Sequence, residues 1–421
     1  MAATGDTPTS AGTPVGPLEG VKVLDLSSVV MGPFATQLLG DLGADVVTVE
    51  DKAGDTNRAM GPGPIARLSG VAMNLMRNKR SIGLDLKHPD GRAACLRLAA
   101  ASDVVVTNLR PAPLSRLSLT YDDVRAVHPD VVFCQAHGYP SDSDKANEPA
   151  YDDIIQSASG IGDLFRRLGQ EELLLPTLVA DKICGLTMAY AILAALVHRE
   201  RTGEGQRIEV PMIDVMRAFM LVEHGAGAIP LPPLDRPGYR RILTPERRPH
   251  RTADGWINVL PYTKENYEAL FRAGAREDLL DDERIASRAA RVAHSDSLYR
   301  DVASFLPRRT TDEWLALCAQ IGVPATRAAT LEELVEVLPE GVHPHAGRYR
   351  MIPPPVRFSA TPASVRRPAP LVGEQGRAVL SELGYQPQQL DALEAAGVLH
   401  SAELEWAAAA SDEVPDGRPV T

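Results

Sequence analysis

Short runs of apolar and β-branched residues alternate with helical segments through the first half of the chain, and this alternation constrains its fold most strongly. The predicted strands cover residues 21–26, 44–50, 81–86, 103–108 and 131–136. One intervening helix is predicted from Pro33 to Leu42, and another from Pro89 to Ala101. Strands and helices that alternate in this way form a parallel sheet with helices on both faces. The sequence therefore predicts an α/β fold with a Rossmann-like large domain.

The rest of the chain divides at two segments of unusual composition. With 421 residues, the chain is longer than one compact domain usually is. Residues 225–251 are rich in Gly, Pro and Arg, residues 344–372 are rich in Pro, and both segments predict long linkers. A smaller α+β domain is expected between them, in which Thr310 and Thr330 begin helices with capping boxes. The predicted organisation is a disordered tail at 1–16, the large domain at 17–224, a linker at 225–251, the small domain at 252–343, a linker at 344–372, C-terminal helices at 373–404 that return to the large domain, and a disordered tail at 405–421.

The composition is that of a globular chain and excludes several classes of function. Hydrophobic residues make up 44% of the chain, which is enough for a large core. No apolar run approaches the roughly 18 residues of a membrane span, and the N-terminus lacks the apolar core of a signal peptide. The four cysteines are far apart, so we expect neither a zinc site nor disulfides and predict a cytoplasmic location. The net charge of −11 disfavours binding to nucleic acid.

Common nucleotide and metal motifs are missing from the sequence. The turn after the first strand, residues 27–33, lacks GxGxxG, so its backbone cannot approach a pyrophosphate as NAD or FAD binding requires. No GxxxxGK[ST], HExxH or GxSxG pattern occurs, which argues against P-loop enzymes, zinc proteases and serine hydrolases. The ten histidines are scattered along the chain. We therefore predict no metal site.

Two short basic clusters, residues 77–80 and 108–116, adjoin predicted strands. Open parallel sheets bind ligands beyond the carboxyl ends of their strands. The second cluster follows a strand and is therefore well placed for phosphates. The sequence leaves the alternative open that these side chains are surface charges.

Asp181 stands at the start of a strongly apolar helix that is predicted to run to about Arg199 and to be buried. One interpretation is that Asp181 is the N-cap of this helix, because Asp is among the best capping residues. The other is that it is a reactive carboxylate. A helix N-terminus favours the ionised form of an aspartate, which is the form that a nucleophile needs.

Several segments, taken together and in order, resemble the class III CoA-transferase (CaiB–BaiF) family. They extend from about residue 17 to about residue 399. The segments are residues 17–26, 32–37, 42–50, 54–58, 78–85, 103–108, 156–160, 179–185, 201–206 and 368–374. Each is short, but their common order is specific to the family.

The resemblance implies a fold, a mechanism and partners. It implies a homodimer of two interlocked subunits, each with a Rossmann-like large domain, a small domain and two long connecting segments. It also implies that Asp181 attacks an acyl-CoA to give a mixed anhydride, which the CoA thiolate converts to an aspartyl-CoA thioester. The expected partners are acyl-CoA and a carboxylic acid, with coenzyme A as substrate and no tightly bound cofactor.

The same resemblance assigns coenzyme A to a set of named residues. They are Ser28, Val29, Val30, Met31, Lys52, Asn78, Arg80, Asn108, Arg116 and His137. Asn108 and Arg116 match CoA-contacting positions best. Formyl-CoA transferases carry a glutamine where this chain has Val30 and a lysine where it has His137. These departures leave specificity for formate and oxalate open.

The family also contains α-methylacyl-CoA racemases, which use an aspartate matching Asp181 together with a histidine. Tyr151 occupies the place of that histidine here. A tyrosine, with a pKa near 10, is a poor general base at neutral pH. A transferase is therefore preferred, and a racemase or a non-catalytic CoA-binding protein remains the alternative.

Two further hypotheses concern the first linker. Residues 224–228 are glycine-rich and match a loop that shields the aspartyl intermediate in some transferases, or they are simply part of the linker. The nearby arginines suggest that a dicarboxylate is bound, or they are surface charges. These arginines are Arg240, Arg241, Arg247, Arg248 and Arg251. The identity of the donor and acceptor acids does not follow from the sequence.

Overall fold

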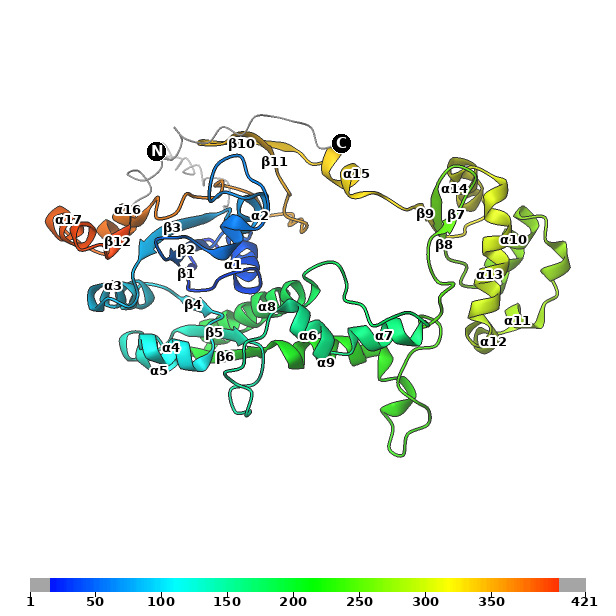
Figure 1. The fold of residues 1–421 in the computed structure, drawn as a ribbon, viewed down its shortest axis with the longest axis horizontal. Helices are drawn as coiled ribbons and strands as arrows, with labels where there is room; N and C mark the ends of the chain where they lie inside the picture. Colours follow the sequence, from blue (N-terminus) through cyan, green and yellow to red (C-terminus); the bar gives the residue numbers. More distant parts are fainter. Residues whose placement is uncertain (1–15, 401–421) are drawn as a thin grey trace, which may run out of the picture. The chain divides into compact units, whose positions relative to one another are not determined.

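The computed structural model of this protein describes residues 16–400, and the chain divides into two compact units (Figure 1). What we call the sheet unit comprises residues 16–155, 177–216 and 338–400, and the small unit comprises residues 156–176 and 217–337. The tails predicted to be disordered, 1–16 and 405–421, lie outside the described residues except for residue 16.

In the described residues, the sheet unit contains one seven-stranded sheet. Its strands are β1 (Lys22–Asp25), β2 (Asp45–Glu50), β3 (Lys79–Leu84), β4 (Val104–Thr107), β5 (Val132–His137), β6 (Gln206–Pro211) and β12 (Leu399–His400). Strands β1 to β6 are parallel in the order β3-β2-β1-β4-β5-β6, and β12 pairs antiparallel with β3 at the edge. The prediction of an α/β chain with a parallel sheet is confirmed. From β1 the next two strands in the chain are added on one side, and β4 to β6 are added on the other side of β1. Ligands are expected at this switch point, beyond the carboxyl ends of β1 and β4.

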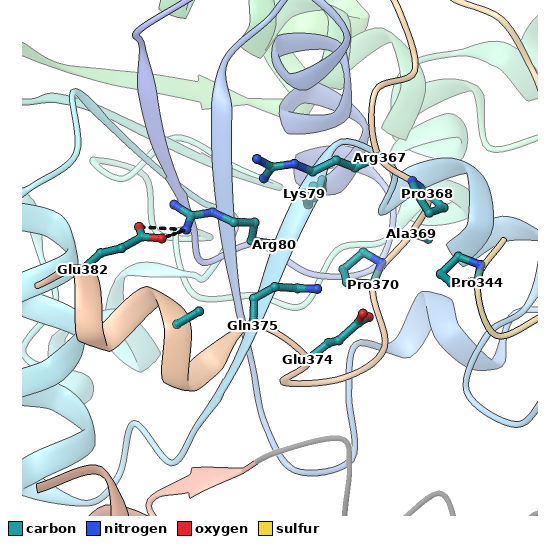
Figure 2. Close-up of a pocket in the computed structure, with 11 residues that line it drawn as sticks. Lys79, Arg80, Pro344, Arg367, Pro368, Ala369, Pro370, Glu374, Gln375 and Glu382 are labelled. Atoms are coloured by element: carbon teal, nitrogen blue, oxygen red, sulfur yellow. Dashed lines mark hydrogen bonds and ion pairs between the residues drawn. The ribbon is translucent and has the colours of Figure 1, made fainter. Parts of the chain in front are cut away.

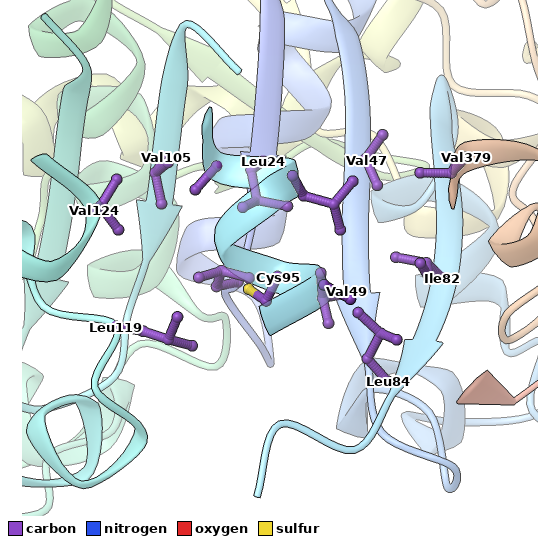
Figure 3. Packing of buried hydrophobic residues seen from close by; sticks show 14 of the residues in the cluster. Leu24, Val47, Val49, Ile82, Leu84, Cys95, Val105, Leu119, Val124 and Val379 are labelled. Atoms are coloured by element: carbon purple, nitrogen blue, oxygen red, sulfur yellow. The ribbon is translucent and has the colours of Figure 1, made fainter. Parts of the chain in front are cut away.

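Helices cover both faces of this sheet (Figure 1). Successive strand side chains alternate between the faces, and Leu24, Ile82 and Val105 belong to the core on one of them (Figure 3). That face is covered by α3 (Pro89–Ala100), α5 (Tyr121–Val127), α16 (Gly376–Glu382) and α17 (Pro387–Ala395). Helices α1 (Met31–Asp41) and α8 (Val179–Thr202) pack against each other and against strands of the sheet.

Shorter elements complete the sheet unit. They are η1 (Thr56–Ala59), α2 (Gly70–Leu75), α4 (Pro111–Leu117) and the antiparallel pair β10 (Glu340–His343) and β11 (Gly347–Arg350). Two helices, α6 (Asp152–Ala158) and α9 (Met212–His224), begin in the sheet unit and end in the small unit.

Two helices that matter for the site begin earlier than the sequence predicts. Helix α1 begins at Met31 and not at Pro33, so the proline occupies its third position. Helix α8 begins at Val179, with Leu178 as its N-cap residue. Asp181 is therefore the third residue of the helix, and the interpretation of Asp181 as the N-cap is wrong.

Helix α8 is buried on one face only. Its buried residues include Ala180, Cys184 and Met188, whereas Leu186 and Tyr190 are exposed in the single chain. The prediction of a buried helix is therefore confirmed for one face of α8 and wrong for the other in the single chain. By length and composition alone, α8 could also cross a membrane, a test that the core helices of soluble proteins pass as well.

The small unit contains a three-stranded antiparallel sheet and a group of helices. The strands are β7 (His250–Arg251), β8 (Trp256–Val259) and β9 (Ala325–Arg327). The helices that lie wholly in this unit are α7 (Ile161–Arg167), η2 (Ala226–Ala228), α10 (Lys264–Ala273), η3 (Glu277–Leu279), α11 (Glu283–Ala286), α12 (Arg288–Ala293), α13 (Ser295–Phe305), η4 (Leu306–Arg308), α14 (Thr311–Gln320) and α15 (Leu331–Glu336). The capping boxes predicted at Thr310 and Thr330 are confirmed. Trp314 lies in the core of this unit, where its Nε1–H donates to the carbonyl of Leu306 at 2.8 Å.

A buried carboxylate, Asp25, ties the end of β1 to its surroundings. Its Oδ2 accepts hydrogen bonds from Lys79 Nζ at 2.9 Å and from Thr36 Oγ1 at 2.6 Å. Its Oδ1 accepts from the backbone N–H of Ser27 at 3.0 Å and from the Ser27 hydroxyl. Lys79 also donates to the carbonyl of Pro33. The group therefore connects β1, β3 and α1 just before the turn that leaves β1.

Candidate active site

The turn of residues 28–30, between β1 and α1, lies at the point where the sheet reverses its direction of progress, and Asn108 holds it there. The backbone N–H of Ser28 donates to Asn108 Oδ1 at 3.0 Å, and Asn108 Nδ2 donates to the carbonyl of Ser28 at 2.7 Å. Asn108 directly follows β4. One side chain thus joins the carboxyl ends of the two strands that flank the expected ligand site.

A second set of contacts holds Val29 in a strained conformation. Val29 has a φ of 70°, which is costly for a β-branched residue and typical of functional sites. Its N–H donates to the carboxylate of Asp55 at 3.2 Å, and Asn57 Nδ2 donates to its carbonyl at 3.2 Å. Burial raises the pKa of Asp55 to about 6, and the charge of Glu50 adds to the shift. These contacts fix the backbone of the turn.

Asp181 is held close to this turn by the packing of α8 on α1. A Cβ atom on Gly185, one helical turn after Asp181, would lie only 2.7 Å from the carbonyl oxygen of Met31. Glycine is therefore required for α8 to approach the start of α1 so closely. Leu178 offers no side-chain cap, and the backbone N–H of Asp181 donates instead to Asp152 Oδ1 at 2.9 Å.

The electrostatics of Asp181 differ from those predicted from its place in the helix. Burial raises the pKa of Asp181 to about 7, and the charges of Asp152 and Asp153 add to the shift. The prediction that the helix N-terminus favours the ionised form is therefore wrong in its net direction. Only 8% of Asp181 is exposed, so loss of hydration and two neighbouring carboxylates outweigh the helix dipole.

These groups line one pocket of about 220 Å³ in the sheet unit. Its lining residues are Ser28, Val29, Val30, Met31, Asn108, Leu109, Arg110, Pro113, His137, Gly138, Pro149, Ala150, Tyr151, Asp181 and Met212. The structure thus brings the predicted carboxylate together with six of the ten predicted CoA-binding residues.

His137 is the buried histidine of this pocket. It ends β5, is 3% exposed, and its Nε2 lies 3.4 Å from Glu209 Oε1. Burial lowers the pKa of His137, and Glu209 opposes this shift. His137 therefore contributes a neutral imidazole to the pocket at pH 7.

A basic groove of about 620 Å³ adjoins the pocket. Lys87, His88, Arg92 and Arg116 contribute to its lining, together with Pro113. Because Pro113 also lines the pocket of Asp181, the groove and the pocket meet at α4. Arg116, one of the predicted CoA-binding residues, lies in this groove.

The other three predicted residues do not line the pocket. Lys52 is exposed. Asn78 and Arg80 lie just before and near the amino end of β3, whereas the pocket lies at the carboxyl ends of strands. Arg80 binds the carboxylates of Asp45 and Glu382 and lines a separate cavity of about 430 Å³ (Figure 2).

Three residues that shape the pocket are not among those predicted from the sequence. They are Arg110, Asp152 and Asp55. Arg110 belongs to the basic cluster at 108–116, in which only Asn108 and Arg116 are predicted to bind coenzyme A. Asp152 directly follows Tyr151, which occupies the place of the racemase histidine. Asp55 lies in the family segment 54–58. Their contacts are with residues far away in the chain, so no local pattern in the sequence indicates them.

Comparison with known proteins shows the family of the chain. The model of CoA-transferase family III matches residues 18–376. The chain belongs to this family, which confirms the resemblance found in the sequence. It is an enzyme of the CoA-transferase type, and its general reaction is the transfer of coenzyme A.

Named relatives cover nearly the whole chain. Succinate–glutarate CoA-transferase of Agrobacterium fabrum is 32% identical, over 87% of this chain and 96% of that protein. Succinyl-CoA:glutarate CoA-transferase of Mus musculus is 30% identical, over 92% of this chain and 91% of that protein. Formyl-CoA:oxalate CoA-transferase of Escherichia coli O157:H7 is 26% identical, over 90% and 98%.

Solved structures of the same type resemble the whole fold. A CAIB/BAIF family protein from Brucella suis has a TM-score of 0.74 and 28% identity, and the match covers 87% of this chain and 99% of that one. Rv3272 from Mycobacterium tuberculosis has a TM-score of 0.73, with the same identity and coverage.

The raised pKa of Asp181 predicts how stability depends on pH. An unfolded aspartate titrates near 3.9, so the folded chain binds one more proton than the unfolded chain between about pH 4 and pH 7. The contribution of Asp181 to stability therefore falls as the pH rises through this range. Asp181→Asn removes this loss. The melting temperature of the variant minus that of the wild type should therefore be larger at pH 8 than at pH 5. Thermal melts at both pH values measure this gain, and an equal difference at both would contradict it. Asp153→Asn removes only one of the two neighbouring charges and keeps the Asp181 carboxyl, so its gain should be smaller than that of Asp181→Asn.

Proposed function

We propose that this enzyme transfers coenzyme A from an acyl-CoA to a carboxylic acid, with Asp181 as the covalent carrier. One observation carries the proposal. Asp181 is a buried carboxylate in a pocket that shares Pro113 with a basic groove. A carboxylate that must be acylated and a ligand that carries phosphates would each have a suitable site, and the two sites are contiguous.

The chemistry needs only this carboxylate and the two substrates. Asp181 attacks the thioester carbonyl, the C–S bond breaks, and a mixed anhydride and CoA thiolate form. The thiolate then attacks the aspartyl carbonyl and releases the donor acid, which leaves an aspartyl-CoA thioester. The acceptor carboxylate attacks this thioester and forms a second anhydride with release of the thiolate. Attack of the thiolate on the acceptor acyl carbon gives the new acyl-CoA and restores Asp181.

The groove would hold the charged end of coenzyme A. Arg92 and Arg116 can pair with phosphate oxygens, which arginine binds in a two-pronged geometry. The pantetheine arm would then pass Pro113 and reach the turn of residues 28–30 beside Asp181. The clamped backbone of that turn would position the thioester.

Replacement of Asp181 tests the proposal directly. Asp181→Ala should reduce CoA exchange by at least about a thousandfold, because Asp181 is the one carboxylate among the described residues that line the pocket. Hydroxylamine should convert Asp181 of the wild type to a hydroxamate only when acyl-CoA is present, as mass spectrometry of peptides would detect. Asp153→Asn is the matched control and should retain exchange. Undiminished exchange by Asp181→Ala would refute covalent transfer. Deuterium incorporation at the α-carbon of a 2-methylacyl-CoA, without exchange of CoA, would favour the racemase.

We further propose that short dicarboxylates are the donor and acceptor acids. Two relatives act on succinate and glutarate by name. Among the described residues that line the pocket, Arg110 has the permanent positive charge that a distal carboxylate would bind. The arginines of residues 240–251 support the idea less. Arg241 stacks on Tyr262 at 4.1 Å, and Arg251 stacks on Trp256 at 4.3 Å.

Substrate selectivity of an Arg110 variant tests this assignment. Arg110→Gln should raise the KM for succinyl-CoA about tenfold or more, because it removes a charge-assisted hydrogen bond, and should leave the KM for propionyl-CoA nearly unchanged. Arg116→Gln is the matched control. It should raise both KM values alike, because the two donors carry the same phosphates into the groove. Steady-state kinetics with the two donors separates the cases. Equal effects of Arg110→Gln on both donors would contradict the assignment.

We also propose that two chains form a homodimer, interlocked as in the family. The exposed face of α8 supports this proposal, because Leu186 is 51% exposed, Tyr190 63% and Val197 50%. Apolar side chains in such a row are typical of surfaces that bind another chain.

Mass in solution tests the dimer. Light scattering of the purified chain should give twice the mass of the 45.3-kDa chain. The double replacement Leu186→Glu and Tyr190→Glu should lower this mass or the melting temperature, because it places charges in a buried interface. Asp153→Asn, on a different helix, should not change the mass. A monomeric wild type at micromolar concentration would contradict the proposal.

A further inference from the structure

Two buried carboxylates meet at the start of α8. Asp152 is the first residue of α6, is 3% exposed, and accepts the backbone N–H of Asp181 through Oδ1 at 2.9 Å. Asp181 is 8% exposed and points into the pocket that it lines. Asp153, the next residue of α6, is exposed.

The neighbourhood of Asp181 is dominated by negative charge. The titratable or charged groups that face it, or line its pocket, are Asp152 and Asp153 of α6, Cys184 of α8, His137 at the end of β5, Tyr151 before α6 and Arg110 before α4. Burial and the charges of Asp181 and Asp152 raise the pKa of Cys184, so its thiol is neutral. Burial lowers the pKa of His137 and keeps its imidazole neutral. Asp152 and Asp153 contribute the charges that act on Asp181 most strongly.

The proposed reaction changes the charge of this site. In the free enzyme the ionised form of Asp181, which is the form that attacks the thioester, is a carboxylate beside Asp152. When the aspartyl-CoA thioester has formed, Asp181 is a neutral acyl group, and the released donor acid has carried one negative charge into the solvent. Repulsion between the two carboxylates is therefore relieved by acylation. The same repulsion returns when the carrier is set free.

We propose that Asp152 is a positioning residue that fixes the start of α8 through its hydrogen bond and whose negative charge shifts the internal equilibrium toward the aspartyl-CoA thioester. The inference rests on the proposed function of Asp181. A neighbouring charge acts on the acylation equilibrium in the same direction as on protonation, because both remove the negative charge of Asp181. If the charge of Asp152 accounts for one pH unit in the titration of Asp181, it accounts for about a tenfold change in the acylation equilibrium.

The experiment measures this equilibrium in the full-length enzyme. Wild type and variants are incubated with succinyl-CoA and succinate at fixed ratios, and intact-protein mass spectrometry gives the ratio of CoA-bound to free chain. Asp152→Asn keeps an oxygen acceptor for the Asp181 N–H but removes the charge. It should lower the ratio about tenfold and move the acidic limb of the kcat/KM profile about one pH unit lower. Asp153→Asn, the matched control, should lower the ratio less than about threefold, because its charge is exposed to solvent.

Two further variants separate charge from capping. Asp152→Glu keeps the charge and should retain most of the thioester. If Asp152→Asn proves too unstable to measure, Leu178→Ser in the same chain supplies a local N-cap to α8 without restoring the charge. The double variant should regain stability but keep the low ratio. A ratio and a pH profile equal to those of the wild type in Asp152→Asn, or in the double variant, would overturn the role of Asp152 while Asp181 remained the carrier. The absence of a thioester in the wild type would overturn the proposed function itself.

Discussion

The buried carboxylate of Asp25 is the constraint on which the geometry of the site depends. It pairs with Lys79, which reaches it from β3, and it accepts hydrogen bonds from Thr36 of α1 and from Ser27. An unpaired charge in this position would be strongly unfavourable, so the end of β1, the start of β3 and α1 must stay together. The turn that follows Ser27 therefore has a fixed origin. Asn108 then sets its distance from β4, and Asp55 holds Val29 in its strained conformation.

The second principle of the site is the balance of charge around Asp181. A surface aspartate is ionised far below neutral pH, but burial and the two carboxylates of α6 raise the pKa of this one to about 7. As the carrier that we propose, Asp181 gains from such an environment, because neither its ionised nor its acylated state is then strongly preferred. The basic groove beyond Pro113 is a separate electrostatic region with the opposite sign. An anionic ligand can therefore be bound in the groove without a basic group that neutralises the charge of Asp181.

Local patterns predicted the elements better than their ends. The strand signals at 21–26, 44–50 and 131–136 correspond to β1, β2 and β5, because apolar and β-branched runs between helices are a local property. The sequence predicts the start of α8 at Asp181, because Asp is a good N-cap residue. In the structure the helix begins earlier, and the N–H of Asp181 donates to Asp152 of another helix. Asn78 and Arg80 were expected near the ligand, but they lie near the amino end of β3, away from the pocket. A short motif does not indicate which end of a sheet it will occupy.

The sequence by itself determined the parallel α/β fold and the family, and it identified Asp181 as the candidate carrier, because these depend on periodicity and on ordered motifs. Six of the ten predicted CoA-binding residues line the pocket with Asp181, since they follow strands whose carboxyl ends meet. Only the tertiary structure decided the charge state of Asp181, the place of Arg110 and the partnership with Asp152. Each of these depends on burial and on distances between residues far apart in the chain. Dehydration and Coulomb interactions act through space, so a linear pattern does not contain them.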